Sequence, residues 1–226
     1  MRIMIDAGHG GEDPGAVGNG LQEKDLTLKL ALRIGRLLAA RGADVHYTRT
    51  DDTFVDVSDR ARAANKAEVD YFLSIHINAG GETGFESFTY PGSSGPTSAY
   101  RNVIHRKVAG VFEYNGLPDR GQKQADLTVL QEMFMPAVLF EYGFIENVRD
   151  AKLLNSKNFI EQIVSATAAG VAEAFGLPAP QPIDDVSEWA REARDWAVWA
   201  GITDGTKPRD AVTREEVWTM LYRMKN

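Results

Sequence analysis

Short apolar runs alternate with longer amphipathic segments along the first 176 residues of the chain. Runs of the length expected for strands occupy five ranges: 2–8, 44–50, 69–78, 84–90 and 136–144. Segments in which apolar residues recur every three or four positions predict helices at 23–42, 57–67, 99–116, 147–154 and 158–176. This alternation predicts an α/β fold, with a mostly parallel or mixed sheet flanked by helices on both faces.

Local signals refine the ends of three elements. Gly42 follows the helix predicted at 23–42 and is expected to act as its C-cap glycine. Ser58 is expected to be the N-cap of the next helix. In the third predicted strand, alternation places His76 on the same face as Phe72, close to the end of the strand. A single histidine there has a structural interpretation, as a core side chain hydrogen-bonded to backbone.

A second, smaller domain is predicted after the first. The main domain is expected at 1–176, a proline-rich linker at 177–183, and a helical tail at 184–226. The tail holds all four tryptophans of the chain: Trp189, Trp196, Trp199 and Trp218. The first three fall on one helical stripe, so the rings are predicted to form the core of a small helical domain. The alternative is that one ring is exposed and stacks on a sugar or a partner.

Composition narrows the classes of function. The chain has 226 residues, of which 43% are hydrophobic, so it can form a substantial core. Its net charge of -7 argues against nucleic acid as a partner. With no cysteine, a metal ion would need His, Asp or Glu ligands. We see no signal-peptide pattern and no segment of membrane length, so we expect no membrane partner, and either retention in the producing cell or export without a signal.

Candidate chemical groups follow the ends of three predicted strands. His9 comes just after the first strand in a glycine-rich turn, His76 lies near the end of the third, and Glu141 follows four apolar residues in the last. Glu23 lies in the first turn of a helix, where the helix dipole favours a carboxylate. Ligands bind at the carboxyl ends of strands in open α/β sheets. Two imidazoles and one carboxylate form the ligand set of catalytic zinc hydrolases.

Each candidate also has a structural interpretation. Glu23 could be a solvated residue of the first helical turn, and His9 could serve a tight turn, although its surroundings lack the lysine and spacing of a phosphate-binding loop. Glu141 is harder to dismiss, because a carboxylate in an apolar strand needs a partner. His46 and His105 have no matching partner pattern and are interpreted as structural or surface residues. The residues alone do not decide whether Glu23 or Glu141 is the metal ligand.

Several motifs resemble one known family. They occur in family order from residue 3 to about 154 and read IDAGHGGEDPGAVG, LQEKDLTLKLA, VHYTRTDD, RARAAN, DYFLSIHINA, TVLQ and PAVLFEYGFIENVRDAKLL. This part of the chain is similar to the zinc-dependent N-acetylmuramoyl-L-alanine amidases of the type 3 family. The resemblance implies that His9, Glu23 and His76 bind one Zn²⁺ and that Glu141 is the catalytic carboxylate. Ile77, where the family more often has alanine, lies on the opposite face of the strand from His76.

The resemblance also implies a substrate and a place of action. The expected activity is hydrolysis of peptidoglycan at the amide bond between N-acetylmuramic acid and L-alanine. Without an export signal, a phage endolysin that stays in the host cytoplasm until lysis is the favoured interpretation, with a host or prophage autolysin as the alternative. The rival functions are a zinc carboxypeptidase or endopeptidase acting on the stem peptide, and a catalytically dead protein that binds the wall.

The tail resembles a second family. DVSEWAREARDWAVWAGITDG followed by VTREEVWTMLYR is similar to one S-layer homology repeat, a module associated with cell-wall polymers. The resemblance implies a helical module at 184–226 whose partner is a secondary cell-wall polymer. Such repeats commonly occur in threes, whereas this chain carries one.

Overall fold

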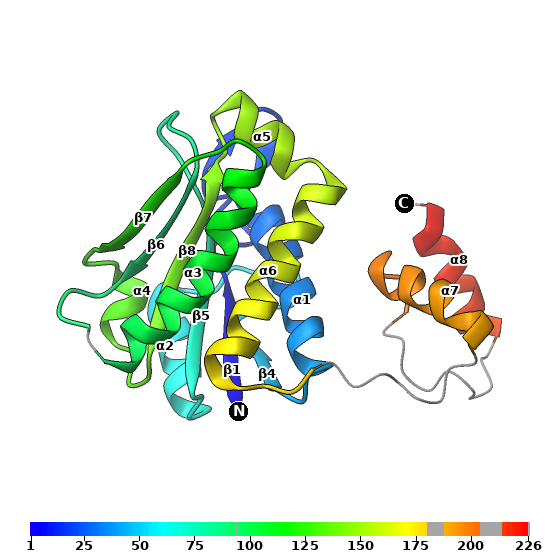
Figure 1. Cartoon of the computed structure of the whole chain (residues 1–226), viewed down its shortest axis with the longest axis horizontal. Coiled ribbons are helices and arrows are strands. Elements are labelled where there is room, and N and C mark those ends of the chain that lie inside the picture. Colours follow the sequence, from blue (N-terminus) through cyan, green and yellow to red (C-terminus); the bar gives the residue numbers. More distant parts are fainter. Residues whose placement is uncertain (94, 180–187, 204–213, 226) are drawn as a thin grey trace. The chain divides into compact units, whose positions relative to one another are not determined.

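The computed structural model describes residues 1–93, 95–179, 188–203 and 214–225. The chain divides into two compact units, Met1–Pro180 and Gln181–Asn226. The first unit contains a six-stranded sheet (Figure 1). Its strands lie in the order β4 (Asp44–Tyr47), β1 (Arg2–Ala7), β5 (Tyr71–Asn78), β8 (Ala137–Phe144), β6 (Phe85–Thr89) and β7 (Asp119–Gln124).

Neighbouring strands of this sheet are parallel, except that β6 runs antiparallel to β8. A separate pair of two-residue strands, β2 (Val17–Gly18) and β3 (Leu21–Gln22), is antiparallel and lies between β1 and the first helix in the sequence. The prediction of a mostly parallel or mixed sheet is therefore confirmed. Because β1, β5 and β8 are adjacent and parallel, their carboxyl ends meet at one edge of the sheet.

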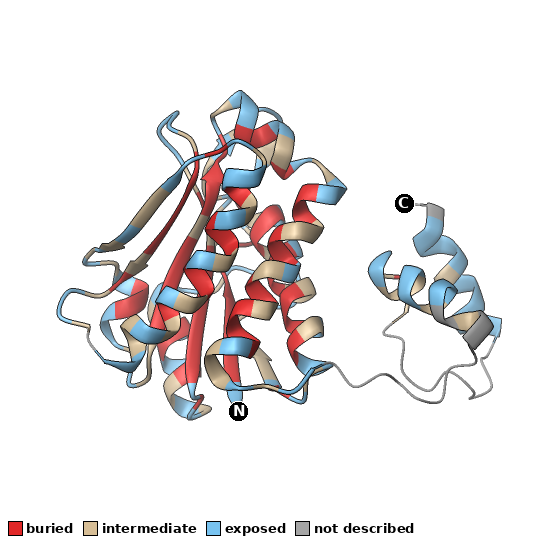
Figure 2. Cartoon of the chain, viewed as in Figure 1, coloured by how far each residue is buried: buried red, intermediate tan, exposed pale blue. Residues whose placement is uncertain are grey.

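Helices cover both faces of the sheet, as predicted (Figure 1). The large core cluster is formed with three long helices: α1 (Glu23–Ala39), α3 (Pro96–Tyr114) and α6 (Lys157–Phe175). The smaller cluster on the other face is formed with two short helices: α2 (Val57–Lys66) and α4 (Thr128–Gln131). A further helix, α5 (Val148–Leu154), follows β8. In Figure 2 the central strands of the sheet and the inward sides of the long helices of the first unit are buried, whereas the edge strand β7 and the outward sides of those helices are more exposed.

The alternation along β5 decides which face holds the candidate histidine. Leu73 and Ile75 pack in the large cluster, whereas Phe72 packs in the smaller one. Since successive side chains of a strand point to opposite faces, His76 lies on the face of Phe72, which α2 and α4 cover. Two short helices protect less of the sheet than three long ones, so this face can keep a polar opening near the ends of the strands.

Some local predictions were wrong. The N-cap of α2 is Asp56, whose carboxylate accepts a hydrogen bond from the Ser58 backbone N–H at 2.9 Å. Helix α1 ends at Ala39 with Ala40 as its C-cap, so Gly42 lies beyond the cap and serves the turn into β4 with a φ of 81°. Strand β7 was not predicted, because its sequence, DRGQKQ, has no alternating apolar residues and forms an edge of the sheet.

The second unit contains α7 (Glu188–Trp199) and α8 (Arg214–Lys225). The prediction that the tryptophan rings form its core is wrong for three of them: Trp196, Trp199 and Trp218 are 49%, 41% and 63% exposed. The side chain of Trp189 and most of the predicted linker lie outside the described residues. Among the described helices, none has both the length and the hydropathy needed to span a membrane.

Candidate metal centre

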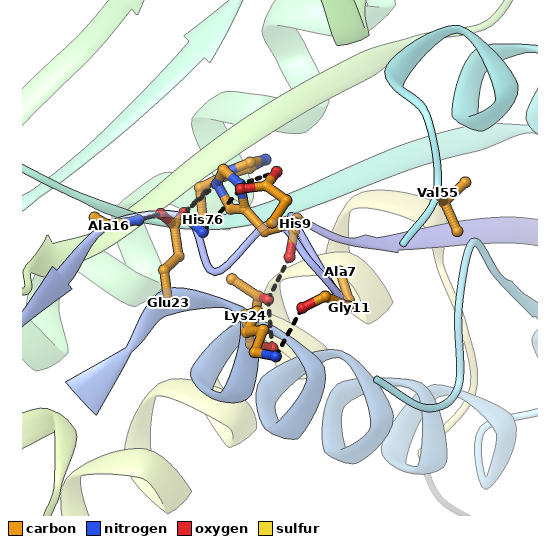
Figure 3. Close-up of polar contacts among 12 residues, drawn as sticks. Ala7, His9, Gly11, Ala16, Glu23, Lys24, Val55 and His76 are labelled. Carbon is orange, nitrogen blue, oxygen red and sulfur yellow. Dashed lines mark hydrogen bonds and ion pairs between the residues drawn. The ribbon is translucent and has the colours of Figure 1, made fainter. Parts of the chain in front are cut away.

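Three side chains from distant parts of the chain converge at the carboxyl ends of β1 and β5 (Figure 3). His9 follows β1 by two residues, in the turn between that strand and β2. Glu23 is the first residue of α1, and its backbone N–H donates to the Ala16 carbonyl at 2.9 Å. His76 lies near the end of β5. The adjacent strands β1 and β5 thus supply one histidine from the turn after β1 and one from β5 itself, and the helix N-terminus supplies the carboxylate.

The ligand atoms are close enough to share one ion. Glu23 Oε1 lies 3.1 Å from His9 Nε2 and 2.9 Å from His76 Nδ1. One ligand atom from each of the three residues lies within 4.8 Å of the others. Two neutral imidazole nitrogens and one carboxylate oxygen are donors that Zn²⁺ accepts, and three protein ligands leave a position for water or substrate. The residues therefore fit a zinc ion of the catalytic type.

Glu23 is held in place by the backbone. Its Oε2 accepts a hydrogen bond from the Ala16 N–H at 2.8 Å, and its Oε1 accepts one from the Ile77 N–H at 2.9 Å. Burial alone would raise the pKa of Glu23, but the hydrogen bonds and charges of His76 and His9 outweigh it and lower the pKa below its ordinary value. Glu23 is therefore a fixed, ionised carboxylate, which is the form that binds a cation.

A second carboxylate orients His9. Asp13 Oδ2 lies 2.8 Å from His9 Nδ1, and Asp13 Oδ1 accepts a hydrogen bond from the Gly15 N–H at 3.0 Å. Burial would lower the pKa of His9, but Glu23 and Asp13 together raise it. With Nδ1 occupied by Asp13, the ring presents Nε2 to Glu23. Carboxylate–histidine pairs of this kind fix the ring orientation in zinc sites.

Two glycines leave room for the ligand side chains. A Cβ atom on Gly8 would lie 2.3 Å from Cε1 of His76. A Cβ atom on Gly15, whose φ is 65°, would lie 2.6 Å from both Glu23 Oε2 and His9 Cδ2. Separations this short are well inside van der Waals contact, so any larger residue would displace a ligand. The glycine-rich turn is therefore needed for the close approach of its backbone to the imidazole and carboxylate groups.

Two buried arginines hold the backbone of the glycine-rich turn in place through hydrogen bonds. Arg60 donates to the carbonyl oxygens of Ala7 and His9 at 2.6 and 2.8 Å, and to Asp6 Oδ1 at 2.7 Å. Arg49 donates to the carbonyl oxygens of Ala7 and Gly8, both at 3.0 Å. Burial alone would raise the pKa of Asp6, but the charges of Arg60 and His76, with hydrogen bonds from Ser74 and Arg60, lower it. The charge of Arg60 is thus paired, and its remaining donors position the backbone of the histidine turn.

Glu141 lies beside His9, Glu23 and His76 but is not part of that metal-binding group. It is opposite His76 in the register between β8 and β5, and opposite Glu86 in the register between β8 and β6. Its Oε2 atom is buried and has no hydrogen-bond partner among the described residues. Burial, reinforced by the negative charges of Glu23 and Glu86, raises the pKa of Glu141 well above its ordinary value. A carboxyl group in this state can hold and exchange a proton.

A cavity of about 450 Å³ is lined by both candidate histidines and by Glu141. Its polar lining includes His9, His76, Asp13, Arg60 and Glu141. Its apolar lining comes from the segment that leads into α2, from the start of α4 and from Leu139 on β8. This volume is within the range of about 300–1,000 Å³ that small-molecule sites occupy. A substrate group held in the cavity would therefore lie close to both the histidines and the unpaired carboxyl group.

The other two histidines lie elsewhere. His46 is on β4, 3.4 Å from Asp44. His105 on α3 is buried, with Nδ1 2.8 Å from the Ser87 hydroxyl and Nε2 2.9 Å from Asp119 Oδ1. Although these three residue types are those of a serine hydrolase, Ser87 is completely buried and cannot meet a substrate. His105 links α3 to the edge strand and is structural, as expected.

The sequence did not assign roles to Asp13, Arg49 or Arg60. All three fall within the quoted motifs, since Asp13 is in GGEDPG, Arg49 in YTRTDD and Arg60 in RARAAN. Charged residues in glycine-rich or helical segments are usually solvated, so their types alone gave no signal. Only the burial of the two arginines, at 4% and 5% exposure, shows that they bind the backbone of the turn and are not solvated surface residues.

The fold and the site together define an α/β protein with a two-histidine, one-carboxylate metal-binding group at the ends of its parallel strands. Residues 3–173 match the model of the Amidase_3 family, described as N-acetylmuramoyl-L-alanine amidase, and the chain therefore belongs to this family. The match spans the six-stranded sheet except Arg2, together with every residue of the candidate site.

Individual relatives agree with this membership. The chain is 46% identical over 179 residues to the sporulation-specific N-acetylmuramoyl-L-alanine amidase of Bacillus subtilis, covering 78% of this chain and 69% of that protein. It is 41% identical to the endolysin of Bacillus phage SPP1, covering 77% of this chain and 66% of the endolysin. The solved catalytic domain of CwlV from Bacillus (Paenibacillus) polymyxa has a TM-score of 0.73 and 32% identity, with 78% and 99% of the two chains covered.

Proposed function

We propose that the protein is a peptidoglycan hydrolase that cleaves the amide bond between N-acetylmuramic acid and the L-alanine of the stem peptide. Membership of the amidase family supports the reaction. We further propose one Zn²⁺ held by His9, Glu23 and His76, with Glu141 as the catalytic carboxylate. The observation that carries this assignment is the convergence of the first three residues beside the unpaired, buried Oε2 of Glu141.

The chain's own residues account for the remaining chemistry. When bound, a zinc ion supplies a Lewis acid that polarises the scissile carbonyl and activates water. Glu141 would accept the proton of the attacking water at Oε2 and deliver it to the departing amine of L-alanine. Asp13 keeps His9 oriented, and Arg60 keeps the turn that carries His9 from moving. The amide is thereby replaced by a carboxylate on the lactyl group and a free amino group on L-alanine.

Two substitutions test the assignment separately. His76→Ala should lose the metal, measured as zinc per purified chain, together with activity. Glu141→Gln should keep the metal but lose most turnover, by about 10²–10⁴-fold for a general acid–base group. Glu113→Gln, an exposed site on α3, is the matched control and should change neither. Full zinc occupancy in His76→Ala, or wild-type turnover in Glu141→Gln, would contradict the assigned roles.

Product analysis distinguishes this activity from that of a peptidase. With defined muropeptides, an amidase releases the intact stem peptide with a new amino group on L-alanine, whereas a carboxypeptidase or endopeptidase shortens the peptide. A catalytically dead wall-binding protein would release neither product. A zinc-specific chelator should abolish cleavage, and added Zn²⁺ should restore it, because the side chains of His9, Glu23 and His76 cannot replace the ion as a Lewis acid.

In the cell, we propose the role of a phage endolysin that acts at the wall after the membrane is breached. The similarity to the SPP1 endolysin supports this role, and the similarity to the sporulation-specific amidase supports the alternative of a bacterial autolysin. Expression in a host bacterium should cause lysis only after the membrane is permeabilised, and Glu141→Gln should cause none. Lysis of intact cells without permeabilisation would favour an exported autolysin.

For the tail, we propose a secondary cell-wall polymer as the partner of a module at 184–226. The exposed rings of Trp196 and Trp218 support this proposal, because exposed aromatic side chains are common contacts for sugars and other partners. The full chain with Trp196→Ala and Trp218→Ala should sediment less with purified cell walls while keeping its zinc content. Unchanged sedimentation would favour a purely structural tail.

A further inference from the structure

The cavity beside the metal-binding residues has an apolar half that the proposed chemistry does not use. It is lined by Phe54, Val57, Leu127, Val129 and Leu139, which together form what we call the Phe54 wall. Phe54 and Val57 are 44% and 38% exposed. A large exposed aromatic side chain beside a reactive group is characteristic of a ligand contact.

The backbone that carries Phe54 is braced against the histidine turn. Lys24 Nζ donates to the Gly11 carbonyl at 2.9 Å (Figure 3). Asp52 links both residues, since its Oδ1 accepts from the Gly11 N–H at 2.8 Å and its Oδ2 accepts from Lys24 Nζ at 2.7 Å. A Cβ atom on Gly11 would lie 2.7 Å from the backbone nitrogen of Phe54, so the two segments touch. The backbone that carries Phe54 is therefore already fixed in the absence of a ligand, so little conformational entropy of this segment is lost on binding.

The charges of the cavity restrict what can occupy it. Three carboxyl groups line it besides that of Asp6: those of Asp13, Asp56 and Glu141. Arg60 is the only lysine or arginine among the described lining residues, and its guanidinium already donates to Asp6 and to backbone carbonyl oxygens. At the Phe54 wall, away from the proposed metal ligands, an anionic group would meet the carboxylate of Asp56 and, among the described lining residues, no lysine or arginine other than the already paired Arg60. This side of the cavity therefore suits a neutral group with one apolar face.

The two sides of the scissile amide differ in this respect. The stem peptide carries free carboxylates, whereas the N-acetylated sugars of the glycan are neutral and have an apolar C–H face. We infer that the Phe54 wall binds an N-acetylated sugar ring of the glycan strand, so that Phe54 is a residue that determines recognition of the glycan side. This inference rests on the proposed function and adds the orientation of the substrate in the site.

Matched substrates test the inference with the full chain. One substrate is an N-acetylmuramoyl peptide, and the other is the same peptide carrying only a lactoyl group, which keeps the scissile amide but lacks the sugar. A second pair varies the peptide length on the same sugar. KM and kcat are measured for the wild type, Phe54→Ala, Phe54→Trp and the control Phe134→Ala, whose ring is 88% exposed outside the cavity. Zinc content is measured for each variant.

Phe54→Ala should raise KM for the muramoyl substrate about five- to tenfold, the range expected for losing one aromatic contact, and leave kcat, zinc content and KM for the lactoyl substrate unchanged. Phe54→Trp should retain the wild-type KM, and Phe134→Ala should have no effect. In calorimetry, a disaccharide of N-acetylglucosamine and N-acetylmuramic acid whose lactyl carboxyl is capped as a primary amide, and which is therefore neutral and peptide-free, should bind the wild type more tightly than Phe54→Ala by the same factor.

Three results would overturn the inference. An equal change in KM for both substrates of the first pair would show that the sugar is not what Phe54 contacts. An effect of Phe54→Ala that grows with peptide length would make the peptide the occupant. Wild-type KM values in Phe54→Ala would remove any role for the ring. These outcomes leave the proposed function intact, whereas a wild-type protein that releases no amino groups from the muramoyl substrate would overturn both.

Discussion

Arg60→Met is the substitution that probes the architecture of the site most directly. In the wild type, the guanidinium forms a buried ion pair with Asp6 at 2.7 Å and donates to the carbonyl oxygens of Ala7 and His9. Methionine fills a similar length of the cavity wall but offers no charge and no donor. The change therefore leaves the Asp6 carboxylate buried without its cation and releases the backbone that carries His9.

The cost can be worked out from these contacts. Removing one partner of a buried ion pair destabilises a protein by about 3–5 kcal/mol. Thr48 and Ser74 still donate to Asp6 at 2.8 and 2.7 Å, so the lower end, about 3 kcal/mol, applies here. For a domain of this size each kcal/mol shifts Tm by about 2–4 °C. Arg60→Met should therefore lower Tm by about 6–12 °C.

Thermal unfolding followed by circular dichroism measures this shift. Arg62→Met is the matched control, because Arg62 lies on the same helix and pairs with Asp59 at the surface. Its Tm should stay at the wild-type value. The double variant Asp6→Asn, Arg60→Met removes both charges and should recover part of the loss. A Tm of Arg60→Met within about 2 °C of the wild type would refute the reasoning.

Three further predictions follow from the site. Gly8→Ala should lose zinc while keeping the fold, because its Cβ atom would meet the ring of His76; Gly110→Ala on α3, where a Cβ atom meets nothing, should keep zinc. Asp13→Asn should weaken zinc binding about 10–100-fold in a chelator competition, and unchanged affinity would exclude an orienting role. Because folding lowers the pKa of Asp6, the ionised carboxylate stabilises the fold fully above its ordinary pKa of 3.8, and this stabilisation is lost as the pH falls through the lower pKa of the folded state. The denaturant midpoint of the wild type should therefore fall as the pH is lowered below 3.8, and the midpoint of Asp6→Asn should fall less.

Much of the fold could be predicted because its signals are local. Periods of two and of three to four residues indicated the central strands and the long helices, since those elements bury one side or both. Strand β7 escaped, because an edge strand made of polar residues buries too little to leave a pattern. The tryptophan stripe in the tail misled for a related reason: periodicity shows which residues share a helix face but not whether another element covers that face.

The candidate site was only partly within reach of the sequence. The glycine-rich turn and the positions of His9 and His76 after apolar strands marked them as candidates, but Glu23 and Glu141 could not be distinguished without the family resemblance. The structure brings Glu23 to both imidazoles and leaves Glu141 beside them with an unpaired oxygen.

Residue types and local periodicity along the chain are enough to define strands, helices and reactive candidates. Which candidates meet depends on the parallel register of β1, β5 and β8, and on a helix N-terminus that returns to the same edge of the sheet. Glu23 and His76 are separated by 53 positions in the chain, yet their side chains lie 2.9 Å apart. Such proximity arises from long-range packing, which no local pattern encodes.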